Sequence, residues 1–133
     1  KPELLKKNIL NKNVMITGAG GSIGSELARQ IMNLSPKKVV LLDNSEFNLY
    51  SIHLQLSDLV SQVEVIPVLS TVTNYHQVRK CISEHQINTI YHAAAYKHVP
   101  MVERNVVSGV YNNVVGTYNI AKVASKINLI ITF

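Results

Sequence analysis

Apolar and polar residues alternate along the chain in blocks that predict strands followed by helices. Short apolar runs with the length of buried strands occur at 14–17, 38–42, 63–69, 89–92 and 129–133. Between these runs, apolar residues recur at helical spacing over about 22–34, 44–56, 74–85 and 102–126. Five strands alternating with four helices predict an α/β fold with a parallel sheet and right-handed crossovers. Pro67 in the third run predicts an edge strand, because proline lacks the N–H that a central ladder needs.

The same spacing predicts which helix positions are buried. In the predicted helix 22–34, the stripe expected to pack on the sheet consists of Ile23, Leu27, Ile31 and Leu34. The apolar positions of 44–56 are Phe47, Leu49, Tyr50, Ile52, Leu54 and Leu56. The segment 102–126 carries valines and tyrosines on most of its faces. It is therefore predicted to be one long helix that begins at about Val102 or Asn105, buried against more than the sheet, with a partner subunit as its cover.

A glycine-rich turn follows the first predicted strand. The stretch 14–24 has the sequence VMITGAGGSIG and is followed by good helix formers. Its glycines are Gly18, Gly20, Gly21 and Gly24. Glycine can take a positive φ, and its missing Cβ lets a phosphate reach the backbone N–H groups at the start of a helix. The stretch therefore predicts a strand, a tight turn and a helix that bind a dinucleotide pyrophosphate.

An acidic residue ends the second predicted strand. Asp43 comes nineteen residues after Gly24, about the offset at which a carboxylate meets the adenosine ribose. The alternative is a glycine-rich loop without a ligand, in which Asp43 caps the next helix. The glycines, the helix and the acidic strand end occur together in the expected order, which favours the dinucleotide.

Three alanines follow the fourth predicted strand, in the block AAAYKHVP. Ala93, Ala94 and Ala95 lie where a parallel strand ends, so they can keep the floor of a ligand crevice low enough for a flat ring. The alternative is that these alanines let a helix pack closely. The two interpretations are equally compatible with the sequence.

Residues 1–13 are polar and rich in lysine, and they predict a short helix or arm ahead of a domain that spans 14–133. The lysines of this stretch are Lys1, Lys6, Lys7 and Lys12, and only Glu3 offsets them. If the parent protein has a membrane segment upstream, these lysines are expected to lie against anionic lipid on the cytoplasmic side.

Composition fits a single cytoplasmic domain. The chain has 133 residues, of which 47% are hydrophobic, and no apolar run approaches the length of a membrane span. The formal net charge of +5 is spread along the chain without alternating aromatic residues, so nucleic acid is not an expected partner. The histidines lack ligand spacing and Cys81 has no second thiol, so no metal site is expected.

Four blocks carry a resemblance to a known family: TGAGGSIGSELARQI, LLDNSEFNLY, HAAAYKHVPMVERN and NNVVGTYNIAKVA. They resemble the extended short-chain dehydrogenase/reductases, and most closely the bacterial polysaccharide-biosynthesis dehydratases that act on UDP-N-acetylglucosamine. The resemblance implies a Rossmann-like, doubly wound parallel sheet that binds NAD(P), with the UDP-sugar bound mostly by a C-terminal region. In this chain the sheet is expected to be truncated after about five strands.

The resemblance also implies site residues. Those implied for the cofactor are Gly18, Gly21, Ser22, Ile23 and Gly24 at the pyrophosphate, Asp43, Asn44 and Ser45 at the ribose, Thr71 and Val72 at the adenine, Ala93, Ala94 and Ala95 at the nicotinamide, and Lys97 and Asn113 beside them. Lys97 and His98 are also implied for the sugar nucleotide, and Asn113 and Thr117 for steadying the active-site loop. Since Asp43 would repel a 2′-phosphate and no arginine follows it, NAD is favoured over NADP.

The implied reaction is a 4,6-dehydration with an internal redox cycle. NAD takes a hydride from C4 of the sugar, a base removes the C5 proton, an acid protonates the leaving C6 hydroxyl, and the hydride returns to C6. In the family, the proton-transfer residues follow a fifth strand like LIITF. No catalytic residue is therefore expected within residues 1–133, and this fragment is expected to be inactive. His98 and Glu103 are the titratable groups expected beside the crevice. The alternatives are a nucleotide-sugar 4-epimerase and a non-catalytic NAD-binding module, and a homo-oligomer is expected.

Overall fold

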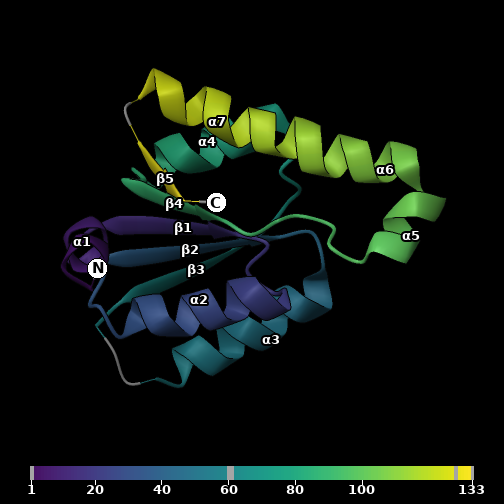
Figure 1. Cartoon of the computed structure of the whole chain (residues 1–133). Coiled ribbons are helices and arrows are strands. Elements are labelled where there is room, and N and C mark those ends of the chain that lie inside the picture. Colours follow the sequence, from purple (N-terminus) through teal and green to yellow (C-terminus); the bar gives the residue numbers. More distant parts are fainter. Residues whose placement is uncertain (1, 60–61, 128, 133) are drawn as a thin grey trace.

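The computed structural model describes residues 2–59, 62–127 and 129–132. Figure 1 shows a sheet between two layers of helices. The elements are α1 Pro2–Ile9, β1 Asn13–Thr17, α2 Ser22–Met32, β2 Lys38–Asp43, α3 Glu46–Ser57, β3 Glu64–Leu69, α4 Tyr75–Glu84, β4 Thr89–His92, α5 Val99–Arg104, α6 Val106–Val110, η1 Tyr111–Val115, α7 Gly116–Lys126 and β5 Ile130–Thr132.

Across the residues that the structure describes, the sheet has five strands, all parallel, in the order β3-β2-β1-β4-β5. The chain builds outward from β1 to β3, then crosses back to place β4 on the other side of β1. This reversal is the switch point of a doubly wound fold, and it confirms the predicted Rossmann-like α/β class. Strand β3 is an edge strand, as Pro67 predicted.

Each face of the sheet has its own apolar core. Along β1, Val14 and Ile16 pack with the helices α2 and α3, whereas Met15 packs with residues of α4 and α7. Figure 1 shows these two helix pairs on opposite faces of the sheet. The central strands are buried on both faces, which explains why their sequences are continuous apolar runs. Cys81 is buried in the α4 layer, and this burial raises the pKa of its thiol to about 11.

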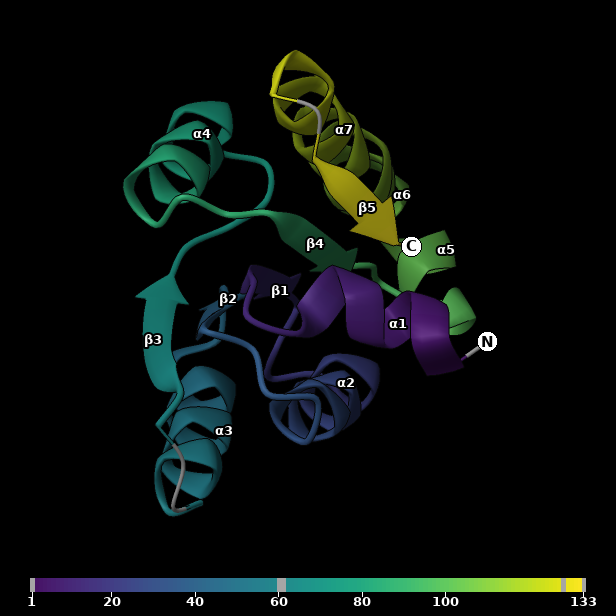
Figure 2. The same cartoon turned by 90° about the vertical axis from the view of Figure 1, so that its left-hand side faces the viewer.

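The lead-in segment forms α1, which lies across the amino-terminal end of the sheet (Figure 2). The side chain of Ile9 is buried in the core on the α2 side. The Thr89 hydroxyl donates to the Asn8 carbonyl oxygen at 2.7 Å. Strand β1 begins at Asn13, one residue before the predicted domain start, and α1 packs against that domain.

The predicted apolar stripes of α2 and α3 are partly wrong. Ile23 is 58% exposed, although Gly24 in the same first turn of α2 is buried. The buried residues of α2 are Gly24, Ala28, Ile31 and Met32. In α3 only one side of the helix faces the sheet, so Leu49, Ile52 and Leu56 are buried. Its other large apolar residues, Phe47, Tyr50 and Leu54, are exposed.

The prediction of one buried helix over 102–126 is wrong in two respects. The helical region begins earlier, at Val99, and is interrupted at Asn105, whose backbone (φ −131°, ψ 52°) is not helical. It also contains η1, a turn of π-helix, between α6 and α7. Val107 is 84% exposed and Tyr118 is 60% exposed, so within the described residues one side of this region has no cover. The last predicted strand is shorter than expected, and its final residue, Phe133, lies outside the described residues.

Candidate functional site

A cavity of about 610 Å³ lies at the switch point, where the loops after β1, β2, β3 and β4 meet the region from α5 to η1. Ligands of doubly wound sheets bind in this place, outside the carboxyl ends of the strands. The lining residues predicted from the sequence are Gly18, Gly21, Asp43, Asn44, Ser45, Thr71, Val72, Ala93, Ala94, Ala95, Lys97 and His98.

The turn after β1 depends on two glycines. Gly18 has a φ of +67°, and a Cβ at this position would lie 2.6 Å from the carbonyl oxygen of Ala93. A Cβ on Gly24 would meet the backbone of Gly18. Gly21 occupies the N-cap of α2, and with no capping side chain the first-turn N–H groups can be offered to an anion. The turn therefore has the shape and polarity of a phosphate cradle.

Asp43 ties the glycine turn to the loop after β2. One carboxylate oxygen accepts a hydrogen bond from the Gly20 N–H, and the other accepts one from the Ser45 N–H, both at 2.8 Å. The Asp43 residue is only 7% exposed, yet it lines the cavity. Each carboxylate oxygen can accept a further hydrogen bond, so ribose hydroxyls could still bind there.

The loop after β4 is held by two consecutive asparagines from η1. The Asn112 side-chain amide donates to the Ala94 carbonyl oxygen at 3.1 Å. The Asn113 side chain accepts from the Tyr96 N–H at 2.8 Å and donates to the Tyr96 carbonyl oxygen at 3.0 Å. Both asparagines lie in the π-helical turn η1 and bind the same loop.

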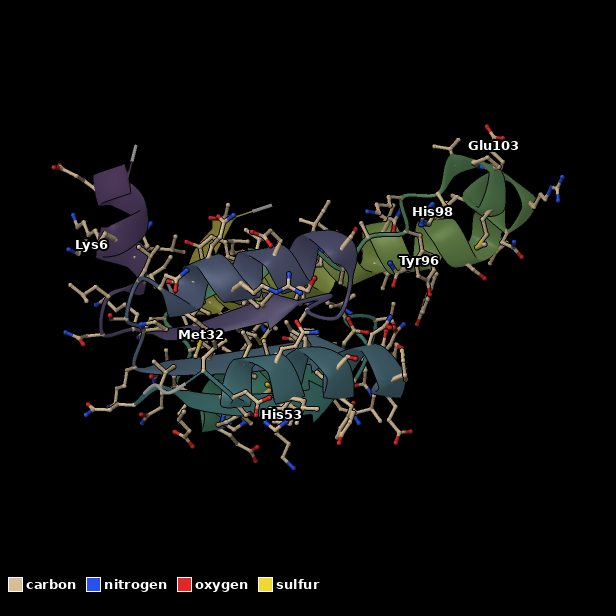
Figure 3. The ribbon with its side chains drawn as sticks, turned by 90° about the horizontal axis from the view of Figure 1, so that it is seen from below. Lys6, Met32, His53, Tyr96, His98 and Glu103 are labelled. Carbon is tan, nitrogen blue, oxygen red and sulfur yellow. The ribbon has the colours of Figure 1, made fainter. Side chains whose placement is uncertain are left out.

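Lys97 places a positive charge beside the glycine turn. Its ammonium group donates to the hydroxyl of Ser22, in the first turn of α2. Because the N-terminal end of a helix already carries partial positive charge, an ammonium there favours an anion between the two. Figure 3 shows His98 on the same loop as Tyr96, and Glu103 at the outer end of α5. His98 lines the cavity, whereas Glu103 is not among its lining residues, contrary to expectation.

A buried histidine stands behind this loop. The ring of His92 is hydrogen-bonded through Nδ1 to the Thr17 hydroxyl at 2.6 Å and through Nε2 to the Thr117 hydroxyl at 3.0 Å. These contacts join the last residues of β1 and β4 to α7. Burial lowers the pKa of His92, because the charged imidazolium loses its hydration.

The cavity also has an end formed by the loop after β3. Thr71 and Val72 line it, and the Asn119 side chain donates to the Val72 carbonyl oxygen at 3.0 Å and to the Thr73 carbonyl oxygen at 3.1 Å. These bonds fix the loop from α7. The Ser70 N–H donates to the Asp43 carbonyl oxygen at 3.0 Å, so this end is continuous with the Asp43 region.

Four predicted site residues do not line the cavity. Ser22 contacts Lys97, Gly24 packs on Gly18, Ile23 is exposed, and Asn113 holds the loop from behind. The sequence analysis also missed several lining residues: Asn48, Ser70, Met101, Val102, Asn105, Ser108, Gly109 and Asn112. Those from α5 to η1 recur at intervals of three or four residues, so helical spacing could have grouped them.

Over the described ranges, no helix is both long and apolar enough to cross a membrane. The same residues contain no group of three or more His, Cys, Asp or Glu side chains that could hold a metal ion.

Comparison with known proteins identifies the family. A family model described as "Polysaccharide biosynthesis protein" matches residues 14–131. The chain belongs to this family. Within the polysaccharide biosynthesis family, it is 40% identical over 124 residues to the capsular polysaccharide biosynthesis protein CapD of Staphylococcus aureus, covering 92% of this chain and 21% of CapD. The resemblance to the extended short-chain dehydrogenase/reductases is confirmed.

Two further proteins are similar to this chain. A UDP-N-acetylglucosamine 4,6-dehydratase (inverting) of Campylobacter jejuni is 26% identical over 110 residues, covering 82% of this chain and 31% of the enzyme. The crystal structure of a UDP-glucose 4-epimerase from Stenotrophomonas maltophila, with bound NAD and formylated UDP-arabinopyranose, has a TM-score of 0.78 at 19% identity. It covers 89% of this chain and 34% of the epimerase, and the likeness shows the fold. The chain thus spans about a fifth to a third of these relatives.

Proposed function

We propose that this chain is the NAD-binding portion of a nucleotide-sugar 4,6-dehydratase that acts on UDP-N-acetylglucosamine in surface polysaccharide or glycan biosynthesis. The observation that carries the proposal is one cavity in which the glycine turn, the Asp43 carboxylate and the AAAYKHVP loop come together. The similarity to a UDP-N-acetylglucosamine 4,6-dehydratase supports the substrate class. The polysaccharide biosynthesis family supports the biological role.

The residues of the cavity fit a dinucleotide along its length. The cradle between Gly18 and the first turn of α2 would take the pyrophosphate, where the backbone leaves no room for a Cβ. Asp43 would accept the adenosine ribose hydroxyls, and Thr71 and Val72 would flank the adenine. The alanines after β4 would lie beside the nicotinamide, and Asn113 would hold that loop in place.

Lys97 supports an anionic ligand at this site. Its bond to Ser22 brings the ammonium to the helix end where the pyrophosphate would bind. A diphosphate there would be stabilised both by the helix dipole and by the Lys97 charge. Lys97 and His98 would also approach the sugar nucleotide, because both line the same cavity from the loop after β4.

The preference for NAD over NADP rests on Asp43. A 2′-phosphate would meet a carboxylate that is already buried and hydrogen-bonded to two backbone N–H groups. The following residues, Asn44, Ser45 and Glu46, include no cation that could compensate. Bound NAD supplies a hydride acceptor and donor, while these residues orient it and exclude the phosphorylated cofactor.

Cofactor titration tests the first part of the proposal. Isothermal titration of the 133-residue chain with NAD and with NADP is expected to show binding of NAD, and weaker binding of NADP. Asp43→Ser removes the charge and is expected to narrow the difference between the two cofactors. Equal affinities of the unaltered chain for NAD and NADP would contradict the Asp43 role, and no binding of either would contradict the proposed cofactor site.

Product analysis tests the second part. The full-length parent protein, incubated with UDP-N-acetylglucosamine, is expected to yield a 4-keto-6-deoxy product with loss of water. The 133-residue chain alone is expected to yield none. The main alternative is a nucleotide-sugar 4-epimerase, because a UDP-glucose 4-epimerase has the same fold in this part of its chain. Inversion at C4 with no change in mass would select the epimerase.

We also propose a homo-oligomer of the parent protein. The uncovered side of α6, η1 and α7 carries large exposed apolar residues: Val106, Val107, Val110, Tyr111, Val114 and Tyr118. A patch of this kind is typical of an interaction surface. Light scattering is expected to report a mass above the monomer, and Val107→Asp is expected to lower that mass. A monomer at all concentrations would contradict the proposal.

A further inference from the structure

Four exposed lysines lie together at the amino-terminal end of the sheet. Lys6 and Lys7 are on α1, Lys12 is on the turn that follows, and Lys37 precedes β2. The Lys37 N–H donates to the Lys12 carbonyl oxygen at 2.9 Å, so the two turns lie side by side. We call Lys6, Lys7, Lys12 and Lys37 the basic edge.

The charge of the basic edge is not neutralised by ion pairs. The ion pairs found among the described residues join Arg29 to Glu26, Lys38 to Glu64 and Lys80 to Glu84. None of them includes a lysine of the basic edge. The acidic residue of α1 is Glu3, one carboxylate beside four ammonium groups. The basic edge therefore presents net positive charge to its surroundings.

A groove lined by both polar and aliphatic residues opens beside Lys7 and Lys12 of the basic edge. Its volume is about 320 Å³, and its lining includes Lys7 and Lys12 together with Ile127, Leu129 and Ile130. Ile127 is 50% exposed and Ile130 is 44% exposed. Leu10, on the turn between Lys7 and Lys12, is 39% exposed. Cations and aliphatic side chains thus share one surface, without an aromatic residue among the groove's lining residues.

The basic edge faces away from the cofactor cavity. Figure 2 shows α1 across one end of the sheet, and Figure 1 shows α5 beyond the other. In Figure 3, Lys6 lies at one end of the molecule and His98 at the other. A flat partner could therefore contact the basic edge while the cavity remains open to solution.

We infer that the basic edge docks on an anionic phospholipid bilayer. Clustered lysines are attracted to the negative potential of such a surface, and exposed aliphatic side chains beside them can enter the interface between headgroups and acyl chains. Single-stranded nucleic acid would use aromatic side chains for stacking, and the groove offers aliphatic ones instead. Docking in this orientation presents the cavity to the aqueous phase, from which a soluble sugar nucleotide would enter.

Vesicle binding by the 133-residue chain tests the inference. Co-sedimentation is measured with vesicles of phosphatidylcholine alone and of an equal mixture with phosphatidylglycerol. We expect binding to the mixture, weakened by added salt because the charges are exposed. Each Lys→Gln change in the basic edge is expected to weaken binding about fivefold, and the triple variant K7Q/K12Q/K37Q about a hundredfold.

A matched control removes one positive charge from the opposite end of the molecule. Arg104 ends α5 and is exposed, so Arg104→Gln has the same charge change as Lys12→Gln without touching the basic edge. Arg104→Gln is expected to leave vesicle binding unchanged. Circular dichroism checks that each variant folds. If the triple variant does not fold, the comparison of Lys12→Gln with Arg104→Gln still tests the inference.

Three results would overturn the inference. The first is equal binding to neutral and anionic vesicles. The second is a loss of binding in Arg104→Gln as large as in Lys12→Gln, because net charge alone would then explain the attraction. The third is tighter binding of single-stranded DNA than of anionic vesicles, which would assign the basic edge to a nucleic acid. None of these results bears on cofactor affinity, which is measured separately by NAD titration.

Discussion

Two neighbouring loops line the cavity, and they are held in different ways. The turn after β1 is shaped by its own backbone, with Gly18 at positive φ and a hydrogen bond from the Gly21 N–H to the Gly18 carbonyl oxygen. The loop after β4 is held by Asn112 and Asn113, which follow the loop residues they bind by 17 or 18 positions. A locally encoded turn and a loop fixed by tertiary contacts thus form one site.

Gly18→Ala is expected to have the largest effect, because it breaks the local turn and its contact with the other loop at once. The new Cβ would lie 2.6 Å from the Ala93 carbonyl oxygen, at a φ that alanine rarely adopts. We expect a loss of about 2–4 kcal/mol in the free energy of unfolding. Urea denaturation followed by circular dichroism measures this.

Gly21→Ala is the matched control for that prediction. Gly21 lies in the same turn, but the nearest atom to its added Cβ is 3.3 Å away and its φ is negative. We expect a loss below about 1 kcal/mol. Equal losses for the two variants would mean that glycine flexibility in general, and not the Gly18 contact, sets the stability of the turn.

Asp43→Asn is expected to have the next largest effect. The asparagine is neutral and accepts through one oxygen only, so the Gly20 and Ser45 N–H groups both lose a charged acceptor and one of them loses its acceptor altogether. Hydrogen bonds to charged groups contribute about 1.5–3 kcal/mol, which corresponds to roughly a 10- to 150-fold loss of NAD affinity if the turn must keep its shape. Isothermal titration measures it. The control is Asp58→Asn, at the exposed C-terminal end of α3, which is expected to leave NAD affinity unchanged.

Asn113→Ala tests the loop that is held by tertiary contacts. The change removes both hydrogen bonds to the Tyr96 backbone. We expect the free energy that opposes local opening of this loop to fall by about 1–3 kcal/mol. Hydrogen exchange at the Tyr96 amide is expected to accelerate more than exchange in β1. Asn113→Asp keeps the acceptor and loses the donor, so it is expected to give intermediate protection. Uniform acceleration across the chain would instead show that Asn113 supports the whole fold.

The smallest effect is expected from the pH dependence of His92. Its pKa is lowered from 6.5 by burial, so the unfolded chain binds a proton more readily than the folded chain. The free energy of unfolding should therefore fall as the pH drops below about 6.5 towards the folded pKa. Above about pH 6.5 the imidazole is neutral in both states, so the fold keeps its full stability there. Urea denaturation between about pH 5 and 7.5 measures the free energy of unfolding. Its dependence on pH is expected to be shallower for His92→Gln than for the unaltered chain. Parallel curves would contradict the prediction.

Where the signal is local, the sequence predicted which turn and strand end meet at the carboxyl ends of the strands. The spacing of Gly18, Gly24 and Asp43 gave the turn, the helix and the strand end, because backbone conformation and strand period depend on neighbouring residues. It failed for α5 to α7, where apolar faces predicted burial. Apolar periodicity shows which face could be buried, but not whether a partner element is present to cover it.

By itself the sequence determined the parallel α/β sheet, the order of its elements and the glycine turn, since these follow from periodicity and from residues with special backbone freedom. Only the tertiary structure decided that Asn112 and Asn113 hold the loop after β4, that His92 bridges Thr17 and Thr117, and that Lys37 lies beside Lys12. These contacts join segments far apart in the chain. Their partners are set by how the layers pack, and no local pattern of residue types encodes that packing.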